Sequence, residues 1–112
     1  MRFQTAPPRT PRIEEKRRGV RLNSRVPVTV EWQDAAGAVF REEAFTRIVG
    51  SYGCMVMLRG DLLAAQSVRI LNNVNQCAAA AVIVWRSAAR PDGYELGIEL
   101  KDPPPDFWGL EL

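Results

Sequence analysis

Four arginines stand close together near the start of the chain: Arg17, Arg18, Arg21 and Arg25. A guanidinium group offers five N–H donors in a planar fork, which matches phosphate oxygens and the O6/N7 edge of guanine. Gly19 breaks any helix across this stretch, so we expect these side chains on flexible or extended backbone. The pattern favours an anion-binding segment. A solvated run of charges ahead of a strand is the alternative.

A serine–glycine turn is the second candidate site. Residues 50–53 read Gly-Ser-Tyr-Gly and separate two stretches that we expect to be strands. Because glycine has no Cβ, a ligand can come close to backbone amides at such a turn. The pattern indicates Ser51 and Gly53 as ligand contacts, although a simple hairpin turn would use the same residues.

The composition argues against catalysis. The 112 residues carry a net charge of +2 and include no histidine, which is the commonest general base and zinc ligand. Cys54 and Cys77 are too far apart for a zinc-finger spacing and are interpreted as buried thiols in a reducing compartment. Glu42 and Glu43 are neighbours in an expected strand, so they point to opposite faces and form no acid/base pair. We therefore expect no enzyme, no metal site and no cofactor.

The hydropathy pattern predicts a cytoplasmic protein without membrane insertion. No apolar run reaches the roughly 18 residues that are needed to cross a bilayer. The first residues also lack the apolar segment of a signal peptide.

Alternation of apolar and polar residues predicts the strands that must position these sites. Val26, Val28, Val30 and Trp32 alternate with polar residues, which predicts a strand over residues 25–33. The alanines at 78–81 favour helix by propensity, but the spacing of the turns around them favours strand. We expect further strands at residues 39–49, 54–58, 67–71, 77–85 and 94–101.

The fold class that follows is all-β, a small six-stranded antiparallel β-barrel. Closing the barrel would also remove exposed edge strands. We divide the chain into a flexible, proline-containing N-terminal arm at residues 1–16, the barrel domain with its arginine motif at 17–101, and a proline-rich aromatic tail at 102–112. Phe107 and Trp108 in this tail are expected to pack on the barrel or on a partner.

Over about residues 14–101 the chain resembles the PilZ domain family. An arginine, three residues and a second arginine precede the first expected strand, and a serine–glycine turn follows the second. The step Gly97-Ile98-Glu99 in the last strand is also typical of that family. The resemblance implies a six-stranded barrel of PilZ type that acts as a receptor for the bacterial second messenger cyclic di-GMP.

The family's first motif maps onto Arg17 and Arg21, with Arg18 as an additional arginine. The resemblance implies that these side chains hold the phosphates and the guanine Hoogsteen edges of the dinucleotide.

The family's second motif, Asp or Asn, x, Ser, x, x, Gly, is incomplete. Ser51 occupies the serine position, Val49 stands in place of the acid or amide, and Cys54 stands in place of the final glycine. Gly53 lies one residue early. Val49 cannot form a hydrogen bond with a guanine edge.

The resulting functional prediction is a cyclic di-GMP-binding regulatory module whose arginines clamp the ligand and change a surface that faces a protein partner. The alternative is a PilZ-like adaptor without nucleotide binding, which would use Phe107, Trp108 and the polyproline run before them as its contact surface. A nucleic-acid-binding barrel is disfavoured, because no aromatic residue accompanies the arginine cluster. We therefore expect no DNA partner.

Overall fold

The computed structural model describes residues 21–109 of the chain. These residues contain seven strands, joined by turns and loops, and no helix. The strands are β1 (Arg21–Leu22), β2 (Pro27–Gln33), β3 (Val39–Gly50), β4 (Gly53–Leu58), β5 (Ser67–Asn72), β6 (Cys77–Arg86) and β7 (Tyr94–Lys101). β2 to β7 lie where strands were expected from the sequence. The predicted arm at residues 1–16 lies outside the described residues.

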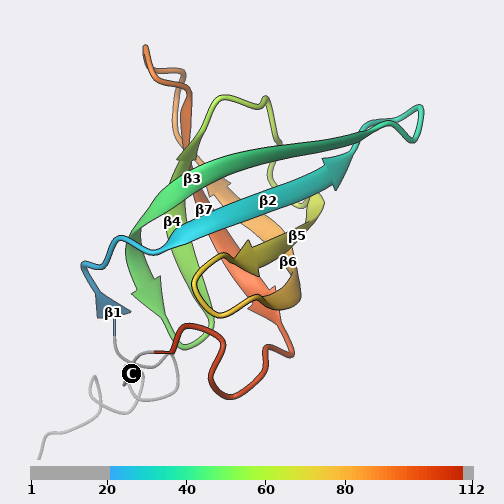
Figure 1. Cartoon of the computed structure of the whole chain (residues 1–112). Coiled ribbons are helices and arrows are strands. Elements are labelled where there is room, and N and C mark those ends of the chain that lie inside the picture. Colours follow the sequence, from blue (N-terminus) through green and yellow to red (C-terminus); the bar gives the residue numbers. More distant parts are fainter. Residues whose placement is uncertain (1–20, 110–112) are drawn as a thin grey trace, which may run out of the picture.

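Six of these strands close into a barrel (Figure 1). The hydrogen-bonded order is β3-β2-β5-β6-β7-β4, and β3 closes the barrel by pairing with β4 as well. All of these pairings are antiparallel. The predicted all-β, six-stranded antiparallel barrel is confirmed, and the short strand β1 is added to it beside the end of β3.

The long strand β3 serves two neighbours because it bends. Its first part pairs with β2, and its last part pairs with β4. A β-bulge between Thr46 and Ile48 lies at the start of the part that pairs with β4. A bulge raises the local twist and turns the strand, which allows one strand to form a corner of the barrel.

Alternate side chains of each strand fill the barrel interior. On β6 the inward positions are Ala79, Ala81 and Ile83, so two of the four alanines that favoured a helix by propensity are core residues of a strand. The fully buried aliphatic side chains around them are Val28, Val30, Val49, Val56, Leu58, Leu62, Ile70 and Leu96.

The aromatic tail closes one end of this core. Phe107 and Trp108 are only 2% and 6% exposed, and their rings meet edge to face with centroids 4.8 Å apart. Asn72 donates a side-chain hydrogen bond to the Phe107 carbonyl at 2.9 Å, and Trp108 Nε1 donates to the Gly50 carbonyl at 2.8 Å. The two aromatic residues therefore pack on the barrel, and their side chains do not provide the exposed contact surface that the adaptor alternative assigned to them.

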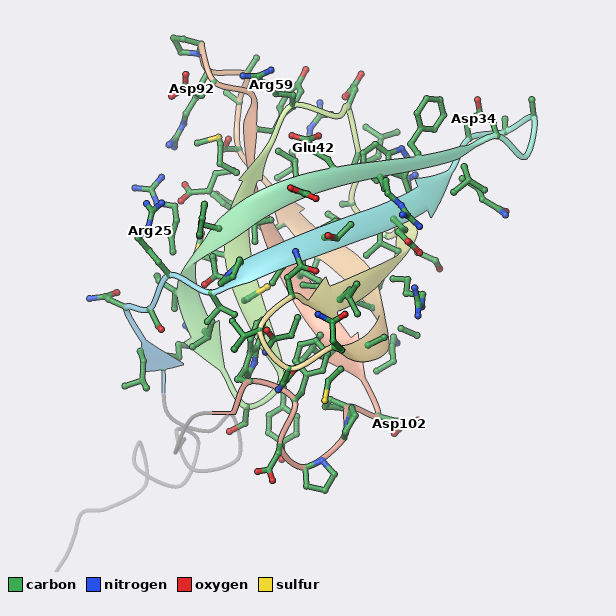
Figure 2. The ribbon with its side chains drawn as sticks, in the orientation of Figure 1. Arg25, Asp34, Glu42, Arg59, Asp92 and Asp102 are labelled. Carbon is green, nitrogen blue, oxygen red and sulfur yellow. The ribbon has the colours of Figure 1, made fainter. Side chains whose placement is uncertain are left out.

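Glu42 holds the loop that joins β4 to β5. Its carboxylate accepts hydrogen bonds from the backbone N–H groups of Arg59 at 2.7 Å and Gly60 at 3.1 Å. Figure 2 shows Glu42 on β3 with Arg59 beyond it at the same end of the barrel. A Cβ on Gly60 would come within 2.7 Å of the Trp32 ring, so the loop also packs closely on β2.

Replacing Glu42 with alanine should lower the free energy of unfolding by about 1–2 kcal/mol, because two loop N–H groups lose a charged acceptor. Urea unfolding would measure the change. Glu43→Ala is the matched control, since Glu43 is exposed on the next position of β3 and should change stability by less than about 0.5 kcal/mol. Equal effects of the two substitutions would show that the carboxylate does not hold the loop.

Candidate functional site

Arg21 is the one arginine of the predicted motif that lies within the described residues, and the barrel fixes its position from two sides. In β1 it pairs with Gly50 at the end of β3. The segment that follows is held by the buried Thr46, whose hydroxyl accepts a hydrogen bond from the Val26 N–H at 2.8 Å and donates one to the Ser24 carbonyl. The arginine is therefore attached to a strand of defined register.

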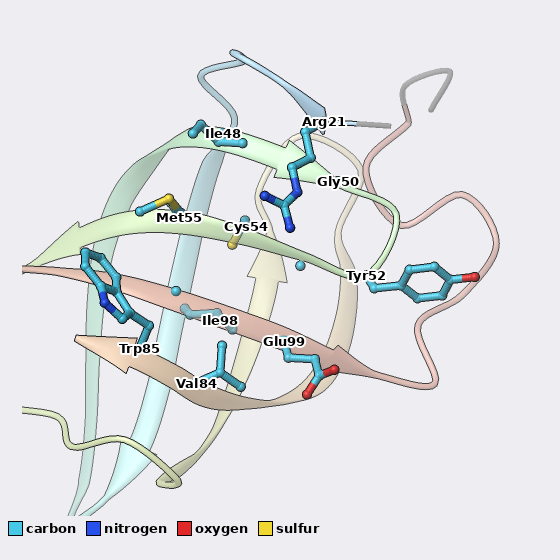
Figure 3. A pocket seen from close by; sticks show the side chains of 12 residues that line it. Arg21, Ile48, Gly50, Tyr52, Cys54, Met55, Val84, Trp85, Ile98 and Glu99 are labelled. Carbon is cyan, nitrogen blue, oxygen red and sulfur yellow. The ribbon is translucent and has the colours of Figure 1, made fainter. Parts of the chain in front are cut away.

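Arg21 points into a hollow of about 930 Å³ on the outer surface of β4, β6 and β7 (Figure 3). We call it the Arg21 hollow. Figure 3 shows Glu99 facing the guanidinium group across β4 and Trp85 farther along the hollow, whereas the Tyr52 ring points away. The lining residues are Arg21, Ile48, Gly50, Tyr52, Gly53, Cys54, Met55, Val84, Trp85, Gly97, Ile98 and Glu99.

A second bulge shapes the β6 side of the hollow. The β6–β7 register shifts between Ile83 and Trp85, so the neighbours Val84 and Trp85 are both exposed instead of alternating. Trp85 is 45% exposed and pairs with Gly97. An added Cβ at Gly97 would lie 3.3 Å from the Trp85 Cβ, so a glycine there lets the indole lie close to β7. The bulge thus presents a large aromatic side chain at the rim of the hollow.

The predicted site residues are only partly brought together. Arg21 and Gly53 line the hollow. Ser51 lies beside it, half-buried in the turn between β3 and β4, and is not one of the lining residues. Arg17 and Arg18 lie outside the described residues.

Gly53 has a structural reason to be glycine. A Cβ at this position would lie 2.3 Å from the carbonyl oxygen of Ile98, because β4 and β7 approach closely there. The glycine is therefore required by strand pairing, whether or not a ligand also uses the space above it. The sequence suggested only the ligand reason, because the β4–β7 register was not visible in it.

The two residues that depart from the PilZ pattern belong to the core. Val49 is completely buried, and Cys54 is nearly so. Burial raises the pKa of the Cys54 thiol to about 12, so this group stays protonated at neutral pH and is a poor nucleophile. At position 49 an acid would enter the barrel interior instead of the Arg21 hollow.

Trp85 and Glu99 were not singled out from the sequence as site residues. Alternation in residues 94–101 places Glu99 on the outer face of β7, so the face that this side chain occupies could be predicted from the sequence. The neighbours of Glu99 and Trp85 depend on the register between strands, which sets Glu99 opposite Gly53 and Trp85 opposite Gly97. No pattern within a single segment of the sequence predicts this register.

Comparison with protein-family models, with curated proteins and with solved structures gave no match. The Arg21 hollow is therefore interpreted from this chain's own structure. The resemblance to PilZ domains stays a prediction from the motifs in the sequence. Within residues 21–109 no three acidic or thiol side chains gather as they would around a metal ion, and no helix is long and apolar enough to cross a membrane.

Proposed function

We propose that the protein is a receptor for cyclic di-GMP that binds the dinucleotide in the Arg21 hollow. The observation that carries this proposal is the placement of one arginine over a solvent-accessible hollow with an exposed tryptophan at its rim. The volume of the hollow lies within the range of about 300–1,000 Å³ that is usual for small-molecule sites.

The chemistry of the hollow suits a nucleotide with two bases and two phosphates. The Arg21 guanidinium can form paired hydrogen bonds with phosphate oxygens or with O6 and N7 of guanine. The exposed Trp85 ring can stack on a base, a contact worth about 1–3 kcal/mol in nucleic-acid binding. Gly53 and Gly97 have no side chains that would fill the space between them.

Arg17 and Arg18 extend the proposed arginine set. Arg17 precedes Arg21 by four residues, so their Cα atoms are at most about 14 Å apart whatever the backbone conformation. Two long side chains attached within that range can converge on the same phosphates. A ligand held between this segment and the barrel would change the surface beside β1, which is the proposed signal to a protein partner.

Isothermal titration of cyclic di-GMP into the purified protein tests the proposal. We expect micromolar or tighter binding that is weakened about 10- to 100-fold in Arg21→Ala, because charged hydrogen bonds to the ligand are lost. Arg41→Ala is the matched control, since Arg41 is an exposed arginine of β3 that pairs with Glu31 and does not line the hollow. It should bind as the unchanged protein does.

The second candidate is the adaptor without nucleotide binding, and the absence of a heat signal at high ligand concentration would favour it. The observation in its support is the exposed apolar surface of β3, where Val39, Phe40 and Phe45 are each about half exposed or more. Large apolar side chains that stay exposed on a strand are a feature of protein contact surfaces. A partner search would then centre on β3.

A further inference from the structure

Glu99 is a carboxylate in a hollow that otherwise suits an anion. It lies on the outer face of β7, opposite Gly53, and is the one acidic residue within residues 21–109 that lines the Arg21 hollow. Its neighbours Ile98 and Leu100 point inward and are almost completely buried. A carboxylate beside a phosphate weakens binding by charge repulsion. A ligand that binds beside Glu99 must therefore place a hydrogen-bond donor against the carboxylate.

The Glu99 side chain is exposed on the outer face of β7. Within residues 21–109 it has no ion-pair or hydrogen-bond partner on another side chain. Glu95, four residues earlier on the same face of β7, differs in this respect. Its carboxylate lies 3.4 Å from both Arg47 and Arg90, so it is neutralised by its own chain.

Guanine supplies the donors that match a carboxylate. Its N1–H and N2–H₂ groups are adjacent on one edge, and an ionised carboxylate offers two acceptor oxygens with no donor of its own. Adenine presents an acceptor at N1, which a carboxylate repels. We propose that Glu99 selects guanine in the Arg21 hollow by accepting hydrogen bonds from N1–H and N2–H₂ of one base. This inference rests on the proposed function.

The other lining groups leave this selection to Glu99. Trp85 lies at the other end of the hollow from Glu99 (Figure 3), and stacking on an indole accepts any base. Val49, which takes the position of the acid in the PilZ pattern, is buried and cannot reach a ligand. Arg21 lies in the same cross-strand row as Glu99, because Arg21 pairs with Gly50, Gly50 with Gly53 and Gly53 with Glu99. Its guanidinium can therefore hold the O6/N7 edge or a phosphate of a ligand whose N1–H and N2–H₂ groups meet Glu99.

Titration of cyclic di-GMP and cyclic di-AMP into the unchanged protein and into Glu99→Gln tests the inference. The unchanged protein should bind the guanine ligand at least about 10-fold more tightly than the adenine ligand. Glu99→Gln should lose about 10- to 100-fold in affinity for cyclic di-GMP, because the amide NH₂ replaces one acceptor, and should lose most of the preference between the two ligands. Glu43→Gln on β3 removes an exposed carboxylate outside the hollow and should change neither affinity.

The outcomes separate the inference from the proposed function. If the unchanged protein binds cyclic di-GMP and Glu99→Gln keeps both the affinity and the preference, the role of Glu99 is overturned and the receptor stands. If neither dinucleotide binds the unchanged protein, the receptor and the role of Glu99 fall together. Thermal unfolding of each variant shows that it is folded, which is expected for a side chain exposed on the barrel surface.

Discussion

Replacing Val49 with aspartate should strongly destabilise the protein and should not create a better ligand site. The substitution completes the first position of the PilZ second motif, but the side chain at this position lies in the core and is completely buried. An unpaired carboxylate there is expected to lower the free energy of unfolding by about 3–5 kcal/mol at neutral pH. Urea or thermal unfolding would measure the loss.

The pH dependence of the stability of Val49→Asp is a second test of whether position 49 is buried. Desolvation raises the pKa of a buried carboxyl above its value of about 3.9 in the unfolded chain, so the folded state binds more protons than the unfolded state. Stability should therefore be greatest at acidic pH and should fall as the pH rises through the interval between the two pKa values. A surface carboxyl would give no such slope.

Ile48→Asp is the matched control for the Val49 substitution. Ile48 is the preceding residue of β3, is only half-buried and lines the Arg21 hollow, so a carboxylate there can stay hydrated. We expect it to cost less than about 1.5 kcal/mol. Equal losses for the two variants, or a Val49→Asp protein as stable as the parent, would show that position 49 does not face the core.

Trp108→Ala should lower the free energy of unfolding by about 3–5 kcal/mol, which is the usual cost of removing a large buried aromatic ring. The indole packs edge to face on Phe107 and donates to the Gly50 carbonyl. Because Gly50 also pairs with Arg21, the same substitution should loosen β1 and reduce ligand binding. Urea unfolding and titration with cyclic di-GMP would measure the two effects.

Two further variants separate the contribution of the buried Trp108 ring from that of its hydrogen bond. Trp108→Phe keeps a ring and loses the hydrogen bond, so it should cost about 1–2 kcal/mol. Trp85→Ala removes an exposed tryptophan of β6 and should change stability by less than about 1 kcal/mol while weakening ligand binding. If Trp108→Ala were as stable as Trp85→Ala, the tail would not be part of the core.

The strands could be predicted from the sequence because their cause is local. A strand with one buried face needs an apolar residue at every second position, and residues 26–32 and 94–101 meet that condition. β1 could not be predicted, because two residues show no alternation and their pairing with β3 is set by the chain around them. The bulge at Val84 and Trp85 was likewise invisible, since a register shift involves two strands.

Of the candidate site, the sequence indicated Arg21 and Gly53 but missed Trp85 and Glu99. Arginine spacing and glycine turns are features of neighbouring residues and can be recognised in a single segment. Residues of β1, β3, β4, β6 and β7 line the Arg21 hollow, so the set of lining residues depends on which strands are adjacent and in what register. The Glu42 contacts with the β4–β5 loop were missed for the same reason.

The sequence by itself thus determined the class of fold and the chemistry available to it. An all-β chain without histidine, with arginines ahead of its first long strand, follows from residue types and short-range periodicity. Only the tertiary structure decided which side of the barrel each residue faces at a bend or a bulge. It buried Val49 and the tail aromatics, and it exposed Trp85 and Glu99 around one arginine. The physical reason is that closing a barrel fixes strand order and register through contacts between residues far apart in the chain.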